Sequence, residues 1–270
     1  IFMVFKKIIC IFVFIFFQTQ VFANDWRPNQ VGSFLSSKIA RSLTDIENAA
    51  YYAKYSYNRN PDSSALGAIA LEALLANGQI TEALPIGLKI SKNMPEVTLA
   101  QYLHVIDSLN SNANDKALET LLKISPNGID NYILSILQTW ASAGSNKELG
   151  GLEIMKEQAD RGVLEPLYDY HTALIYEFIG NIEKANVFYS NIINRSNNAN
   201  AHVYAKAALF FQNNDFTELY NKTLTKLETI DPYSNELFIL KNTKSFSYQK
   251  NITNIKEGIA EVFLNSAEIL

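Results

Sequence analysis

The chain has 270 residues, of which 48% are hydrophobic and 19% are charged, so it can bury a sizeable core. With 23 basic and 27 acidic residues, its formal net charge is −4. Nucleic-acid binding needs a basic stripe along the protein, and none is visible, so the composition argues against a nucleic-acid partner.

Residues 1–23 have the pattern of a targeting segment. Lys6 and Lys7 give it a positive start, an unbroken apolar run of ten residues follows, and it ends on the small residue Ala23. This pattern predicts a signal peptide that is cleaved after Ala23. The competing interpretation is an uncleaved membrane anchor, but a spanning helix needs about 20 apolar residues, and Gln18 interrupts this run too early.

Cleavage at this point would remove the one cysteine, Cys10. The mature chain would then contain no disulfide and no reactive thiol. We expect an exported protein of the periplasm, with no stable membrane span after cleavage; association with the outer membrane is compatible with this location. Residues 24–29 read as a short exposed lead-in.

The rest of the chain is organised around residues 78–95, which repeat the pattern of residues 44–61 at a distance of 34 residues. Small residues recur at the same step, at Ala49, Ala83, Ala117, Gly151 and Ala185. A fixed period of this length indicates a stack of helical hairpins. The sequence therefore predicts an all-α protein with about six hairpins over residues 30–232.

Each residue type at the repeated positions has a physical explanation. A small residue lets the second helix of a hairpin approach the first closely. Gly78 and Gly180 are expected to adopt the positive φ that ends a helix. Because proline cannot continue a helix interior, helix boundaries are expected at Pro61, Pro95 and Pro232. The space under the turn of each hairpin is expected to be filled by Ile46, Ile80, Ile182 and Phe216.

The period and these residue types resemble tetratricopeptide repeats (TPR), whose unit is a 34-residue helix–turn–helix. The clearest copy is residues 166–197, where Tyr176 lies nine residues before Ala185 and Gly180 lies in the turn. The resemblance covers about three-quarters of the chain. It implies a right-handed α-solenoid whose concave groove is lined by the first helix of each hairpin.

The resemblance also implies candidate binding residues in that groove: Phe34, Lys38, Glu72, Leu167, Tyr170, Ala201 and Tyr204. An apolar, aromatic groove with few charges would suit an extended peptide or an amphipathic helix. The alternative explanation is that these aromatic side chains fill the core and contact no partner.

The sequence contains no residue pattern typical of an active site or a metal site. Its histidines, His104, His171 and His202, fall in different repeats, without a ligand spacing such as HExxH. His171 and His202 occupy near-equivalent positions and could approach each other, but surface or hydrogen-bonded histidine is the favoured explanation. We therefore expect no catalysis, no cofactor and no metal.

Residues 233–270 break the period. They are expected to form an irregular connection and then the start of a further helix, with apolar residues at helical spacing at Ile252, Ile255, Ile259, Val262 and Phe263. This pattern runs to Leu270 without the polar capping element that a solenoid needs. We therefore expect that the sequence is truncated there.

Three functions are compatible with these observations. The favoured one is a non-catalytic interaction scaffold whose partner is another protein or peptide. It would resemble exported bacterial TPR proteins that serve envelope assembly or export machinery. The second is the helical arm of a larger envelope enzyme, resembling lytic transglycosylases, whose catalytic domain lies beyond residue 270. The third is an all-helical enzyme complete in this chain, against which the lack of clustered acid, base or metal residues argues.

Overall fold

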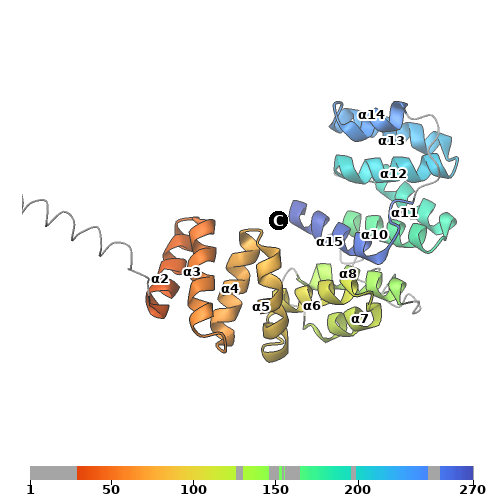
Figure 1. Ribbon diagram of the computed structural model, residues 1–270. Coiled ribbons are helices and arrows are strands. Elements are labelled where there is room, and N and C mark those ends of the chain that lie inside the picture. The colour runs from red at the N-terminus through yellow and green to blue at the C-terminus, as the bar shows by residue number, and fades with distance from the viewer. Residues whose placement is uncertain are drawn as a thin grey trace, which may run out of the picture. The chain divides into compact units, whose positions relative to one another are not determined.

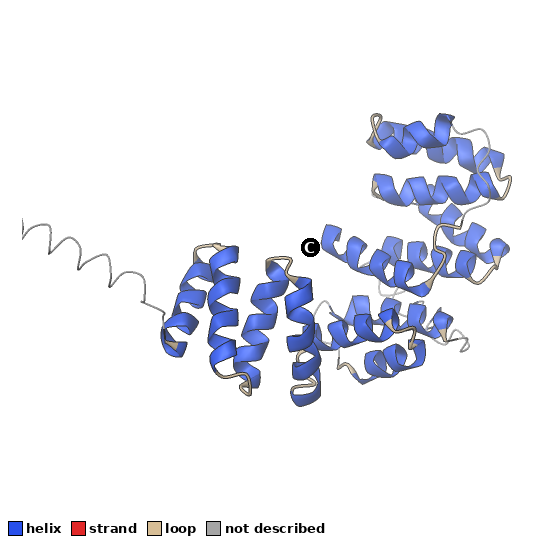
Figure 2. Cartoon of the chain, viewed as in Figure 1, coloured by secondary structure: helices blue, strands red, loops and turns tan. Residues whose placement is uncertain are grey.

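The computed structural model describes residues 29–125, 130–145, 152–153, 155, 165–195, 199–242 and 250–269. Within these residues every regular element is an α-helix, and consecutive helices pack in pairs (Figures 1 and 2), which confirms the predicted all-α helical repeat. No helix in this part of the chain is long and apolar enough to cross a membrane. The predicted signal peptide and Gly151 lie outside the described residues.

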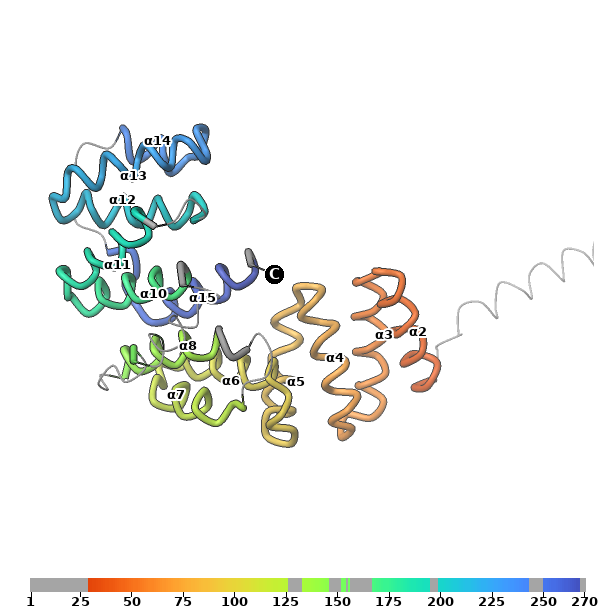
Figure 3. Tube along the Cα trace, turned by 180° about the vertical axis from the view of Figure 1, so that it is seen from behind, coloured from red at the N-terminus to blue at the C-terminus, as the bar shows by residue number. Residues whose placement is uncertain are grey.

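The chain divides into two compact units, residues 1–100 and residues 101–270. Unit 1 contains α2 (Gln30–Ser42), α3 (Ile46–Arg59), α4 (Ser64–Ala76) and α5 (Ile80–Asn93). The next helix, α6 (Thr98–Asn110), begins at the end of unit 1 and continues into unit 2. Unit 2 also contains α7 (Asn114–Lys123), α8 (Asp130–Gly144), α10 (Glu165–Phe178), α11 (Ile182–Arg195), α12 (Ala201–Asn213), α13 (Thr217–Ile230), α14 (Asn235–Asn242) and α15 (Ile255–Ile269), whose order can be followed in Figure 3.

The 34-residue period of the sequence is also found in the spacing of the helices along the chain. Helices α2, α4 and α6 begin 34 residues apart, as do α3, α5 and α7. The hairpin turns repeat a positive φ, between 56° and 83°, at Thr44, Gly78, Asn112, Gly180 and Asp215. This confirms the prediction for the two glycines, which adopt this conformation without steric cost. Asparagine and aspartate tolerate it because their side chains can hydrogen-bond locally.

Helix boundaries follow the local chemistry that the sequence indicates. Helices α3, α5 and α13 end two residues before a proline, at Pro61, Pro95 and Pro232, as predicted. At the other end, helices α2, α3 and α4 start after residues whose side-chain oxygens accept a hydrogen bond from the first turn, Asn29, Asp45 and Ser63. Such caps satisfy amide groups that have no partner inside the helix.

The small residues of the period that the structure describes are buried. Ala83, Ala117 and Ala185 are fully buried and Ala49 is nearly so, as expected for small residues between paired helices. The prediction for Ile46 and Ile80 is wrong, because these side chains are 44% and 59% exposed. A side chain at this repeat position is buried only where large side chains lie next to it. In unit 2 Ile182 and Phe216 pack against the core, and Phe216 stacks on Phe210.

The two units have cores of different composition. In unit 1 the helices pack largely through buried alanines, and its largest fully buried side chains are Leu71, Leu74 and Ile90. In unit 2 the fully buried side chains include seven aromatic ones: Trp140, Tyr168, Tyr170, Tyr189, Tyr204, Phe210 and Phe211. Part of this aromatic core lies under α15, which packs on α8 and α10. The helix predicted from the apolar spacing near the end of the sequence is therefore present, and α14 adds a helix within the segment expected to be irregular.

Candidate functional site

The seven predicted groove residues all lie on the first helices of hairpins: α2 and α4 in unit 1, and α10 and α12 in unit 2. We call the surface formed by α2 and α4 the A-helix face of unit 1. The surface formed by α8, α10 and α12 is the A-helix face of unit 2. The two faces are built from the same part of the repeat, but they differ in what covers them.

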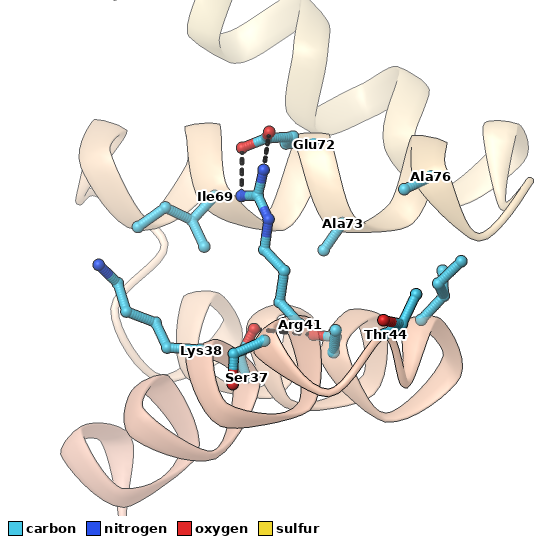
Figure 4. Close-up of a pocket in the computed structure, with 11 residues that line it drawn as sticks. Ser37, Lys38, Arg41, Thr44, Ile69, Glu72, Ala73 and Ala76 are labelled. Atoms are coloured by element: carbon cyan, nitrogen blue, oxygen red, sulfur yellow. Dashed lines mark hydrogen bonds and ion pairs between the residues drawn. The ribbon is translucent and has the colours of Figure 1, made fainter.

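The A-helix face of unit 1 contains an open groove of about 650 Å³. It is lined by Ser37, Lys38, Arg41, Ser42, Thr44, Ile46, Ala49, Ile69, Glu72, Ala73 and Ala76. Figure 4 shows the Arg41 side chain crossing from α2 to Glu72 on α4, with Ile69 and Ala73 on either side of it. The groove is therefore a mixture of apolar wall and charged side chains.

The charged groups of this groove are held by contacts between the two helices. The Arg41 guanidinium donates two hydrogen bonds to the Glu72 carboxylate, at 2.9 and 2.5 Å. Since both side chains are largely solvent-exposed, at 65% and 46%, the pair contributes only about 0–1 kcal/mol to stability. The Lys38 ammonium lies over the Phe34 ring, 5.3 Å from its centroid. Of the groove residues expected in unit 1, Lys38 and Glu72 therefore line this groove together with Arg41, whereas Phe34 contacts Lys38 but does not line it.

α15 packs on α8 and α10 and covers that part of the A-helix face of unit 2, whereas Tyr204 on α12 has the Lys226 ammonium of α13 over its ring. Leu167, Tyr170 and Tyr204, which were expected to line an open groove, are 8%, 1% and 0% exposed. Ala201 is partly buried. The exposure expected of groove residues is therefore not found at these three positions. The cause at Tyr170 is a long-range contact that the repeat pattern does not reveal, since its hydroxyl donates a 2.7 Å hydrogen bond to Glu261 on α15.

Glu261 is the polar centre of this contact. The same carboxylate oxygen that accepts from Tyr170 lies 2.7 Å from Nε2 of His202 on α12. Because an ionised carboxylate can only accept, Nε2 is the donor. Burial by itself would raise the pKa of Glu261, but the hydrogen bonds from His202 and Tyr170 outweigh it and lower the pKa to about 2. Glu261 is therefore an anion at neutral pH.

His171, which interacts with Glu261, is neutral, whereas Glu261 is charged. Its Nδ1 accepts a 3.2 Å hydrogen bond from the Trp140 indole, so the proton of the neutral ring is on Nε2. Complete burial lowers the pKa of His171 to about 4, although the charge of Glu261 opposes the shift. His171 is therefore neutral at pH 7, while His202 lies on the other side of the same carboxylate. The two histidines that the sequence placed in equivalent positions both interact with Glu261.

The residues that precede α15 are anchored to the same face. The buried carboxylate of Glu177 on α10 accepts hydrogen bonds from the backbone N–H and the side-chain amide of Asn251, at 3.0 and 2.9 Å. It also accepts one from the Tyr189 hydroxyl at 2.8 Å. Lys206 on α12 donates to the Asn251 carbonyl at 3.1 Å. A buried carboxylate with three donors is satisfied, so residues 250–269 supply partners that the face itself lacks.

Sequence reasoning missed Arg41, Asn251, Gly258 and Glu261. The apolar spacing of α15 shows that one side of this helix is buried, but it does not show against what. The contacts of these residues, including that of Gly258 with the Trp140 ring, lie about 30 to 120 positions away in the sequence, beyond the reach of any local pattern.

Among the described residues, no group of His, Cys, Asp and Glu is arranged to hold a metal ion. Comparison of the sequence with protein-family models and with curated proteins found no match. The function is therefore argued from the geometry of the two faces.

Proposed function

We propose that this protein is an exported, non-catalytic TPR-type scaffold of the bacterial envelope that binds a peptide or a helix on its A-helix faces. One observation carries the proposal: the face formed by these helices holds an amphipathic helix in unit 2, whereas the corresponding face of unit 1 is an open groove. A face of this repeat can thus accommodate a helix, and a second such face is free to accept one.

The lining of the unit 1 groove indicates the chemistry of its partner. Ile69, Ala73 and Ala76 give an apolar wall on α4, while Lys38 and Arg41 contribute positive charge from α2. A segment with a row of apolar side chains and one carboxylate fits this arrangement, because the carboxylate can join or replace Glu72 at the Arg41 guanidinium. Helix-in-groove recognition commonly uses such a combination of apolar anchors.

The envelope location rests on the signal-peptide pattern of residues 1–23. N-terminal sequencing of the mature protein from its native host tests it. Export with cleavage after Ala23 predicts Asn24 as the first residue, whereas retention of residues 1–23 would contradict the proposed location.

The scaffold function is tested by selecting peptides from a displayed library on the full-length protein and measuring their affinities for variants. Ala73 lines the groove and is only partly buried, so Ala73→Trp should fill the groove and weaken the selected peptides at least tenfold. Ala65 is exposed on the same helix and does not line the groove, so Ala65→Trp is the matched control. Equal affinities for both variants would exclude the unit 1 groove as the binding site.

A further inference from the structure

Residues 250–269 occupy the A-helix face of unit 2 in the manner of a bound ligand. The buried residues of α15, among them Ile255, Ile259 and Val262, recur at helical spacing, while Lys256 and Ala260 between them are exposed. Each helix of this face contributes an aromatic side chain to the contact: Trp140 of α8, Tyr170 of α10 and His202 of α12. Tyr102 of α6, the preceding first helix, packs edge-on against Phe263 of α15. The face therefore recognises α15 along its length.

Two glycines set the closeness of this contact. A Cβ atom on Gly258 would overlap the indole ring of Trp140, and one on Gly144 at the end of α8 would overlap Ile255. Gly144 belongs to the face and Gly258 to the helix that it holds. The face is thus shaped for a helix that has no side chain where it crosses Trp140.

A carboxylate three residues further along supplies the polar recognition. Glu261 is one helical turn beyond Gly258, and it accepts hydrogen bonds from Tyr170 and His202. The combination of a glycine and a carboxylate one turn apart, with Ile255, Ile259 and Val262 buried on the same helix, is the feature of α15 that the face recognises.

Two observations indicate that α15 is an exchangeable occupant. The Oδ1 atoms of Asn251 and Asn265 are buried without a hydrogen-bond partner in the described structure, so the match between this segment and the face is incomplete. An open pocket of about 450 Å³, lined by Lys206 and Glu257 among others, also lies beside α15. A helix that buried no unsatisfied amide and filled this pocket would bind the same face more favourably.

We propose that the A-helix face of unit 2 is a binding site for an amphipathic partner helix carrying Gly-x-x-Glu between apolar residues. In the free chain α15 occupies the site, and the partner helix displaces it. This inference rests on the proposed function and adds the chemistry of one partner and its regulation: a partner must compete with a helix that is already present at high effective concentration.

The probe is a fluorescent synthetic peptide of residues 250–269, and the measurement is its anisotropy with the full-length chain. The peptide contains its own helix start, since Asn254 accepts from the Glu257 N–H and the Glu257 carboxylate accepts from Thr253. In the chain, Gly258→Val should displace α15 without altering the face. We expect the peptide to bind this variant at least tenfold more tightly than the unmodified chain.

Two controls make this result specific. Ala267 is exposed on the same helix and does not line the pocket beside it, so the chain variant Ala267→Val should bind the peptide as the unmodified chain does. A peptide carrying Glu261→Gln should bind the Gly258→Val chain at least tenfold more weakly than the original peptide. If the original peptide binds this folded variant no better than a scrambled peptide does, α15 is a permanent part of the core and the proposal is wrong.

Hydrogen exchange on the unmodified chain tests the proposal even if Gly258→Val does not fold. Excess peptide should accelerate amide exchange in α15 relative to α10, and an unchanged exchange rate would overturn the proposal. Ala73→Trp blocks only the unit 1 groove and should leave this effect intact. Failure at the unit 2 face with normal peptide binding at the unit 1 groove would therefore reject this inference and retain the proposed function.

Discussion

The two units use one repeat to build two different surfaces. In unit 1 the helices meet through alanines, and the A-helix face is left as an open groove bridged by Arg41 and Glu72. In unit 2 aromatic side chains occupy the same face, and α15 covers those of α8 and α10, including Trp140 and Tyr170. Large apolar side chains on a helix face must be removed from water to stabilise the fold, so the residues of unit 2 require a cover that those of unit 1 do not.

The largest effect on this comparison is expected from removing the Trp140 side chain. It is fully buried, it donates a hydrogen bond to His171, and its ring meets Gly258 of α15. Trp140→Ala should cost about 3–5 kcal/mol, the usual range for a buried Trp-to-Ala change, and should reduce hydrogen-exchange protection in α15 first. Protection of α2–α5 should persist. Equal loss in both units would mean that they do not unfold separately.

Acidification should also distinguish the units. The pKa of His171 is about 4 in the folded protein, compared with 6.5 for a free histidine. The unfolded chain therefore binds more protons between these values, and stability falls as the pH drops from 6.5 to 4, by roughly 3 kcal/mol. Glu261, with a pKa of about 2, adds a further loss below its ordinary value near 4.5. Urea unfolding at pH 7, 5.5 and 4 measures this, and His171→Phe should remove the dependence between pH 6.5 and 4.5 while leaving the loss due to Glu261 below pH 4.5.

A smaller effect on stability is expected from substitutions at the repeat position that is a buried alanine in both units. Ala83 in unit 1 and Ala185 in unit 2 occupy the same repeat position, and both are fully buried. Ala83→Trp and Ala185→Trp should each overpack one hairpin and cost about 1–3 kcal/mol. Since a hairpin in a repeat protein mainly contacts its neighbours, each variant should lose exchange protection in its own unit. Unchanged melting temperatures in both would contradict the assigned repeat register.

Part of the candidate site could be predicted from the sequence. The resemblance to TPR repeats implied Phe34, Lys38 and Glu72 as groove residues, and in the structure Lys38 and Glu72 line the unit 1 groove while Phe34 lies beside Lys38. Tyr170 and Tyr204 follow from the same rule, yet both are buried. The period fixes which side of a helix a residue lies on, but it does not state whether another segment covers that side.

The sequence by itself determined most of the helices, several of their boundaries and their pairing into hairpins, although α14 lies in a segment that was expected to be irregular. These depend on interactions within about 34 residues: small residues at the closest contacts, positive φ at Gly78 and Gly180, and prolines after helix ends. The tertiary structure decided which face stays open. That outcome depends on contacts between distant residues, such as Glu261 with Tyr170 and Gly258 with Trp140. Such contacts form only where the packed chain brings complementary shapes and charges together, so no local pattern encodes them.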